Sequence, residues 1–396
     1  MDLSGGSKTL NNQRILIDKV VSTEFQPIAI DDLCGFFSDD EKIISYLESL
    51  RVSENLIDLK RGELYPELLR SLYNLRKIAA KLYDINIAQV QANFGSNGSI
   101  DTILTAVKLG ECKSKSSNAE QLPQENIKSY GGVLFATPGY FRNYNSAESK
   151  NLTIHKVPLD EQFEFPVKDF ISKMLCIHPS LVILVTPNNP TGVPISDKHI
   201  IEVLDNVSND SWVMIDRTLA NTEPEISTMD ILHNYNNKNI VVLHSFSKYK
   251  SMSHHRIGLA LYSNPEMAMK VQPLLPLGLS FEAVIKALRI LRNENGLFPS
   301  QKLLNNIISN KRILKEFIKQ KKGWFLCDFT SNYCLIQLPQ GVRSQNICES
   351  LENNGLHVLG GHDFPDVDER LIRIHTASSP YYINTMCSIL GNKTFS

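Results

Sequence analysis

Four short apolar runs in this sequence each end in polar residues that could do chemistry. These ends read Ala136-Thr-Pro-Gly-Tyr140, Thr186-Pro-Asn-Asn-Pro-Thr-Gly192, Met214-Ile-Asp216 and Leu243-His-Ser-Phe-Ser-Lys248. A guanidinium follows, since Arg256 stands eight positions after Lys248. Each piece alone has an ordinary explanation, such as a turn, a helix cap, a solvated lysine or half of an ion pair. Together they supply an amide, a carboxylate, a primary amine and a guanidinium in a fixed order.

In this order and at these separations, the residues resemble those of fold-type I pyridoxal-phosphate enzymes. They are similar in particular to the class I/II aminotransferase superfamily, with features of histidinol-phosphate aminotransferase-like members. The similar region runs from about Leu59 to Arg373. The resemblance implies pyridoxal 5′-phosphate as the cofactor, an α-amino acid as the small-molecule substrate, and a homodimer with shared active sites.

The resemblance assigns the catalytic roles to four side chains. The Lys248 amine would form the aldimine with the cofactor, a Schiff base, and would then move the proton of the Cα carbanion, or quinonoid. Asp216 would keep the pyridine nitrogen protonated, so that the ring works as an electron sink. Asn189 would donate to the cofactor O3′ and also contact the substrate. Tyr140 would stack on the ring face.

The cofactor phosphate is nearly a dianion and needs several converging donors. Backbone N–H groups at a predicted loop-to-helix junction form a first set, because a helix N-terminus favours an anion: Gly98, Ser99 and Ile100. Side chains form a second set: Ser245, Ser247 and Arg256. By resemblance, Tyr65 reaches the phosphate of the neighbouring subunit.

Two residues are candidates for binding the substrate. By resemblance, the Arg373 guanidinium would hold the substrate carboxylate with two hydrogen bonds; the alternative is an arginine on a half-exposed strand. Glu63 could meet a cationic substrate side chain, and the alternative is a solvated loop carboxylate. No metal site is expected, because the seven cysteines are scattered without a Cys-x-x-Cys pair and no His-Glu-x-x-His motif occurs.

The sequence departs from the family pattern near the cofactor. Many relatives place a tyrosine where this chain has Leu219, so Asn189 would act alone on O3′ or Asn221 would substitute. His254 and His255 are either a surface pair or an extra acid/base group beside the phosphate. Simple transamination is the default reaction. The alternative is a non-transaminating outcome: β- or γ-elimination, cyclisation, oxidation or decarboxylation, on an arginine-like or other amino acid in specialised metabolism.

A third class of function is a catalytically silent binding or regulatory protein that kept the fold. The joint presence of Lys248, Asp216, Asn189 and Arg256 speaks against it, because a silent copy has no chemical need for them.

Short apolar strands alternating with helices must position these residues. The sequence predicts strands at 133–136, 181–186, 212–215 and 240–243, in a mainly parallel sheet covered on both faces. Ligands of such sheets bind outside the carboxyl ends of the strands. A smaller α/β unit follows, with helices at 282–292, 301–320, 344–353 and 382–390 and strands at 324–328, 333–338, 356–359 and 370–375.

The expected organisation has three parts. Residues 1–58 form an N-terminal segment on the small domain, 59–278 the large cofactor-binding domain and 279–396 the small domain. With 41 Lys and Arg against 42 Asp and Glu, the net charge is −1, so no nucleic-acid or membrane partner is expected. The scattered cysteines and the lack of an apolar leader predict a cytoplasmic protein.

Overall fold

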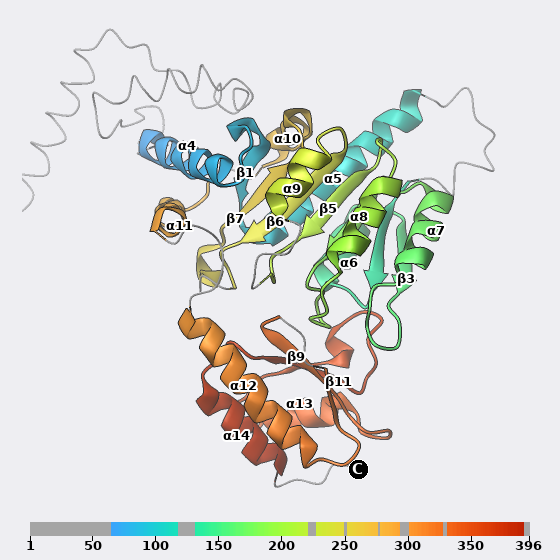
Figure 1. Ribbon diagram of the computed structural model, residues 1–396, viewed down its shortest axis with the longest axis vertical. Helices are drawn as coiled ribbons and strands as arrows, with labels where there is room; N and C mark the ends of the chain where they lie inside the picture. Colours follow the sequence, from blue (N-terminus) through green and yellow to red (C-terminus); the bar gives the residue numbers. More distant parts are fainter. Residues whose placement is uncertain are drawn as a thin grey trace, which may run out of the picture.

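The computed structural model describes residues 65–117, 131–220, 227–248, 252–275, 278–293, 301–327 and 331–391. Two sheets organise these residues, a seven-stranded sheet in the upper part of Figure 1 and a four-stranded sheet in the lower part. The predicted N-terminal segment 1–58 lies outside the described residues. Among the described helices, none combines the length and the apolar character needed to cross a membrane.

The large sheet has the order β1-β7-β6-β5-β4-β2-β3. Its strands are β1 (Val90–Asn93), β2 (Val133–Thr137), β3 (Ile154–Pro158), β4 (Leu181–Val185), β5 (Trp212–Asp216), β6 (Asn239–Ser245) and β7 (Gly258–Tyr262). β7 runs antiparallel to both its neighbours, while β2 to β6 pair in parallel. The carboxyl ends of the predicted strands β2, β4, β5 and β6 therefore meet at one edge, as the motifs require.

Helices cover both faces of this sheet, so the central strands β4, β5 and β6 bury side chains on both faces. Alternate residues of β4, such as Val182 and Ile183, belong to two different apolar clusters. One cluster includes side chains of α4 (Tyr65–Leu82), α7 (Val167–Ile177), α8 (Asp197–Asn206), α9 (Thr228–Asn234) and α11 (Phe281–Asn293). The other includes side chains of α5 (Gly95–Ser117), α6 (Phe141–Ser149) and α10 (Pro265–Val271).

The small sheet is antiparallel, with the order β10-β11-β9-β8. Its unit contains α12 (Gln301–Lys319), β8 (Phe325–Cys327), β9 (Tyr333–Gln337), α13 (Ser344–Glu352), β10 (Leu359–Gly360), β11 (Leu371–His375) and α14 (Pro380–Gly391). Ile372 and Ile374 of β11 enter the apolar cluster under the helices. Since side chains alternate along a strand, Arg373 and His375 belong to the opposite face.

The structure differs from the expected domain boundary at residue 279. Helix α11 packs against α4, and Ala283, Val284 and Ala287 belong to the large unit's apolar cluster. We propose that the boundary falls after α11. The predicted α/β fold class with a mainly parallel sheet is confirmed, although strands β1, β3 and β7 were not predicted.

Candidate active site

The ends of the parallel strands and one face of the small sheet enclose a cavity of about 260 Å³. The side chains that line it come from both units: Ser96, Asn97, Tyr140, Phe141, Val185, Asn189, Asp216, Thr218, Leu219, Ser245, Ser247, Lys248, Ser253, Arg256, Tyr333 and Arg373. Eight of the expected site residues are in this set: Tyr140, Asn189, Asp216, Ser245, Ser247, Lys248, Arg256 and Arg373.

A buried carboxylate marks the floor of the cavity. Asp216 is the last residue of β5 and is 4% exposed. Its Oδ1 accepts a hydrogen bond from the Thr218 backbone N–H at 2.9 Å. Burial raises the pKa of Asp216, because taking a carboxylate out of water disfavours its charged form. A cationic ring nitrogen beside Asp216 would stabilise the charged form of this carboxylate.

A cup of hydrogen-bond donors forms where α5 begins. Gly95 has φ +64°, and a Cβ there would lie 3.0 Å from Arg256 Nη2 and 3.7 Å from Ser247 Oγ. Arg256 Nη1 donates to Ser247 Oγ at 3.3 Å and to the Ser253 carbonyl at 2.9 Å. The absence of a side chain at Gly95 therefore keeps open a space ringed by a helix N-terminus, a guanidinium and hydroxyls, a donor set suited to a phosphate.

The structure places other residues at this cup than the expected backbone donors. Helix α5 starts at Gly95, so Ser96 and Asn97 line the cavity. Gly98, Ser99 and Ile100 lie farther along the helix and do not line it. The Gly98 N–H already donates to the Phe94 carbonyl, and Ile100 is 1% exposed in the apolar core. The first N–H groups of a helix are the ones without intrahelical acceptors, which explains the shift toward Ser96.

An aromatic side chain faces the cavity from the start of α6. The Tyr140 hydroxyl donates to Asn97 Oδ1 at 2.8 Å. Burial and, to a smaller extent, the charge of Asp216 raise the pKa of Tyr140, so its phenol stays protonated and serves as a donor. This hydrogen bond ties the loop after β2 to the N-terminus of α5.

The small unit closes the cavity with a fixed guanidinium. Arg373 Nη1 donates to Asn189 Oδ1 at 2.5 Å across the two units. The Arg373 Cζ lies 4.3 Å from the ring centroid of Tyr333 and 5.0 Å from that of Phe364. Lys248 Nζ lies 5.9 Å from the centroid of the same Tyr333 ring. Burial lowers the pKa of Arg373, yet a guanidinium stays charged at neutral pH, so a carboxylate partner is favoured here.

Other expected residues lie elsewhere. Glu63 and Asn221 are outside the described residues, and Tyr65 opens α4 with a side chain that is outside them too. Leu219 does line the cavity, at 5% exposure. The two histidines before Arg256 do not: their rings are 4.0 Å apart, and His255 Nε2 contacts Lys286 Nζ of α11 at 2.8 Å. Their positions fit the surface-pair alternative.

Several lining residues were not predicted from the sequence. Ser96 and Asn97 could have been found from Gly95, whose lack of a side chain suits a positive φ and hence the entry to a helix. Tyr333 carries no local signal. Its place beside Arg373 follows from the register of β9 and β11, which pairs residues about 40 positions apart.

Comparisons with known proteins agree with this geometry. Residues 67–389 match the family Aminotransferase class I and II. The chain is 26% identical over 247 residues to the histidinol-phosphate aminotransferase of Methanococcus aeolicus, and the match covers 61% of this chain and 64% of that relative. The match thus spans slightly less than two thirds of the relative's length.

Solved structures share the fold. The histidinol-phosphate aminotransferase from Clostridium acetobutylicum has a TM-score of 0.68 at 18% identity, over 93% of this chain and 97% of that one. The one from Sinorhizobium meliloti, in complex with pyridoxal-5′-phosphate, has a TM-score of 0.65 at 14% identity, over 87% of this chain and 84% of that one.

The expected family, fold type and cofactor are therefore confirmed. The family match runs through α5, the strand ends and β11, the elements that surround the cavity. The chain belongs to the class I and II aminotransferase family, whose cofactor is pyridoxal phosphate.

Proposed function

We propose that this protein is a pyridoxal-phosphate-dependent aminotransferase that acts on an α-amino acid. One observation carries the proposal: the amine of Lys248, the buried carboxylate of Asp216 and the guanidinium of Arg373 line a single cavity. These are the groups needed to hold an aldehyde, to hold a cationic ring and to hold a carboxylate. The family match and the donor cup beside Gly95 support the same reading.

The residues of the cavity fit the cofactor in three places. Ser245, Ser247 and Arg256, together with the first N–H groups of α5, would hold its phosphate. Asp216 would pair with its ring nitrogen. Asn189 uses its Oδ1 to accept from Arg373, which leaves its amide nitrogen as the group that would donate to O3′.

When bound, pyridoxal phosphate supplies a carbonyl that captures amines and a protonated ring that stabilises negative charge at the substrate Cα. Arg373 orients the substrate by its carboxylate, and Tyr333 and Phe364 keep the guanidinium in place. Lys248 Nζ takes the proton from Cα and delivers it to the acceptor carbon. The Asp216 carboxylate holds a proton at the ring nitrogen throughout.

The alternative reactions would use the same residues. They differ from transamination in what happens after negative charge develops at the substrate Cα. Leu219 favours them, because a leucine facing the cavity offers no hydrogen bond to O3′, where a tyrosine would. Elimination, cyclisation, oxidation or decarboxylation would then replace amino transfer. A carboxylate-binding Arg373 argues against decarboxylation, since the other reactions, transamination included, retain the carboxylate.

We further propose a homodimer in which Tyr65 of one subunit reaches the phosphate of the other, with no nucleic-acid or membrane partner. The family resemblance supports the dimer. A cytoplasmic location is proposed as well, since the cysteines of the described residues are free thiols: Cys176, Cys327, Cys334, Cys348 and Cys387.

The test uses purified protein with added cofactor. We expect visible absorbance from bound cofactor, and we expect Lys248→Ala to lose it. Amino acids are then added without a 2-oxo acid. Conversion of one equivalent of cofactor to its amine form, followed by arrest, supports transamination. Continued turnover without an acceptor supports the alternative. Protein that takes up no cofactor contradicts both.

A further inference from the structure

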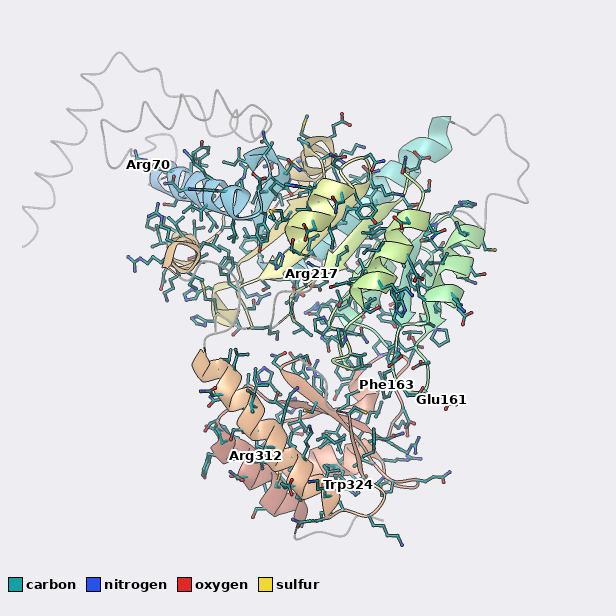
Figure 2. All side chains as sticks on the ribbon, viewed as in Figure 1. Arg70, Glu161, Phe163, Arg217, Arg312 and Trp324 are labelled. Atoms are coloured by element: carbon teal, nitrogen blue, oxygen red, sulfur yellow. The ribbon has the colours of Figure 1, made fainter. Side chains whose placement is uncertain are left out.

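The two units meet at a second place besides Asn189 and Arg373. Asp366, in the small-unit loop before β11, uses its Oδ2 to accept hydrogen bonds from Lys156 Nζ of β3 at 2.7 Å and Thr137 Oγ1 of β2 at 3.1 Å. In Figure 2 the neighbouring loop that carries Glu161 and Phe163 extends from the large unit toward the small one. One carboxylate therefore joins two strands of the large sheet to the small unit.

The surroundings keep this contact charged and oriented. The hydrogen bond from Lys156 lowers the pKa of Asp366, so the carboxylate is ionised at neutral pH. The Tyr144 hydroxyl donates to Thr137 Oγ1 at 2.9 Å, and Lys156 Nζ lies 5.0 Å from the Tyr144 ring centroid. Burial raises the pKa of Tyr144 to about 12, which keeps its hydroxyl a donor.

The backbone also suits an acidic residue at this point. Asp366 has φ +60°, a left-handed conformation that most side chains avoid and that aspartate tolerates. Its side chain is 40% exposed and that of Lys156 39% exposed. The contact is thus open to solvent, and its strength is that of a surface ion pair supported by one hydrogen bond from the Thr137 hydroxyl.

The contact lies close to groups that face the cavity. Thr137 is followed by Pro138 and Gly139, which lead directly to Tyr140, and Asn188 Nδ2 donates to the Pro138 carbonyl at 2.9 Å. Arg373 is carried by the small unit, whereas Lys248 is carried by the large one. The distance between these two groups depends on how the units are placed, and small misplacements of reacting groups are costly.

We propose that Asp366 is a positioning residue which, through Lys156 and Thr137, holds the small unit where Arg373 can meet the substrate carboxylate. The proposal rests on the proposed function of Arg373 and adds a residue outside the cavity. Asp366 touches neither substrate nor cofactor, and it acts by raising the share of molecules with the two units correctly placed.

Asp366→Asn should raise KM for the amino acid about twofold to fivefold, the range open to an exposed ion pair. The value of kcat should change less, because the groups at Cα stay in place once substrate is bound. Lys156→Gln should give the same KM, and the double variant should be no worse than either single one. Exchange of the two charges, in Asp366→Lys with Lys156→Asp, should restore part of the loss.

The same loop offers a matched control. Asp368 pairs with Arg370 inside the small unit, at side-chain exposures of 40% and 35%. Asp368→Asn removes an equally exposed acid two positions away without touching the large unit. Its KM should equal that of the unmodified protein. A KM raised equally in Asp366→Asn and Asp368→Asn would indicate general loop damage and would overturn the proposal.

The contact itself is tested without activity, by a water-soluble carbodiimide on the cofactor-loaded protein. The reagent activates the Asp366 carboxylate, the Lys156 amine attacks, and an amide forms while the carbodiimide takes up the lost water as a urea. Peptide mass spectrometry should find the Lys156–Asp366 link. The Lys150–Asp101 pair, within the large unit, serves as the positive control.

The outcomes separate this proposal from the proposed function. A Lys156–Asp366 link together with a KM effect confined to the Asp366 and Lys156 variants supports it. A missing link beside a formed control link overturns it, and so does an unchanged KM in Asp366→Asn. If no amino acid reacts, the proposed function fails, and the link alone decides whether Asp366 holds the units together.

Discussion

The two sides of the cavity are built in different ways. On the large-unit side, most of the lining groups stand at or directly after the end of a parallel strand, or at the start of a helix, so each is placed by its own short stretch of sequence. On the small-unit side, Arg373 depends on Tyr333 and Phe364, which reach it through strand pairing and a loop. The proposed cofactor side is thus defined by local sequence, and the proposed substrate side by long-range packing.

The change with the largest expected effect removes the proposed contact to the substrate carboxylate and leaves the phosphate contacts in place. Arg373→Gln should lower kcat/KM for amino acids about a hundredfold, because loss of one partner of an enclosed charge pair costs roughly 2–5 kcal/mol. Cofactor affinity should change little, since the cup beside Gly95 lies in the large unit. Steady-state kinetics and a cofactor titration check this together. A weakened cofactor affinity would show that the two sides are not separable.

A second change probes the cofactor side through stability. Burial raises the pKa of Asp216 in the folded protein above its ordinary value, so the folded protein binds this proton more tightly than the unfolded one. Without cofactor, stability should therefore fall as pH rises from about 4 through the raised pKa. Asp216→Asn should remove that fall and leave the cofactor-free protein about 1–3 kcal/mol more stable at neutral pH.

With cofactor bound, the effect of Asp216→Asn on the free energy of unfolding should have the opposite sign. The ring nitrogen would then stabilise the Asp216 carboxylate, so Asp216→Asn should reduce the stabilisation that cofactor gives. Urea unfolding at pH 5 and pH 8, with and without cofactor, measures both quantities. A variant that is less stable without cofactor would contradict the conclusion that burial destabilises the charged form of Asp216.

The smallest expected effect concerns a single methyl group in the cup. Gly95→Ala should raise the dissociation constant of the cofactor about tenfold, because a Cβ at this positive-φ position lies 3.0 Å from Arg256 Nη2. Gly110→Ala is the matched control in the same helix, where a Cβ meets nothing within 4 Å. It should leave affinity unchanged and stabilise α5 by about 0.5–1 kcal/mol. Equal cofactor affinities in Gly95→Ala and Gly110→Ala would contradict the proposal that the cup beside Gly95 holds the phosphate.

Local patterns predicted the proposed cofactor side because each motif there directly follows the apolar run that forms its strand. The apolar runs before Asp216 and Lys248 predicted strands, and parallel strands bring their ends to one edge. Gly98 was expected at the cup, whereas Ser96 lines it, because the boundaries of helices are the least certain part of a sequence-based prediction and glycines stand at both 95 and 98.

The rest could not be predicted from local patterns. Tyr333 and Phe364 form no spacing pattern with Arg373, and their contacts depend on the small sheet and its loop. The same holds for α11, whose amphipathic pattern gives a helix without saying which core it joins; its Ala283 belongs to the large unit. Asp366 is a loop acid in the sequence, and its partners in β2 and β3 are about 200 positions away.

The most direct measurement is to reduce the cofactor-loaded protein with borohydride and map the modified peptide by mass spectrometry. We expect one stable pyridoxyl label per chain, on Lys248, and none in protein carrying Lys248→Ala. A label on a different lysine, or no label in protein that has bound cofactor, would contradict the assignment of Lys248 as the amine that holds pyridoxal phosphate.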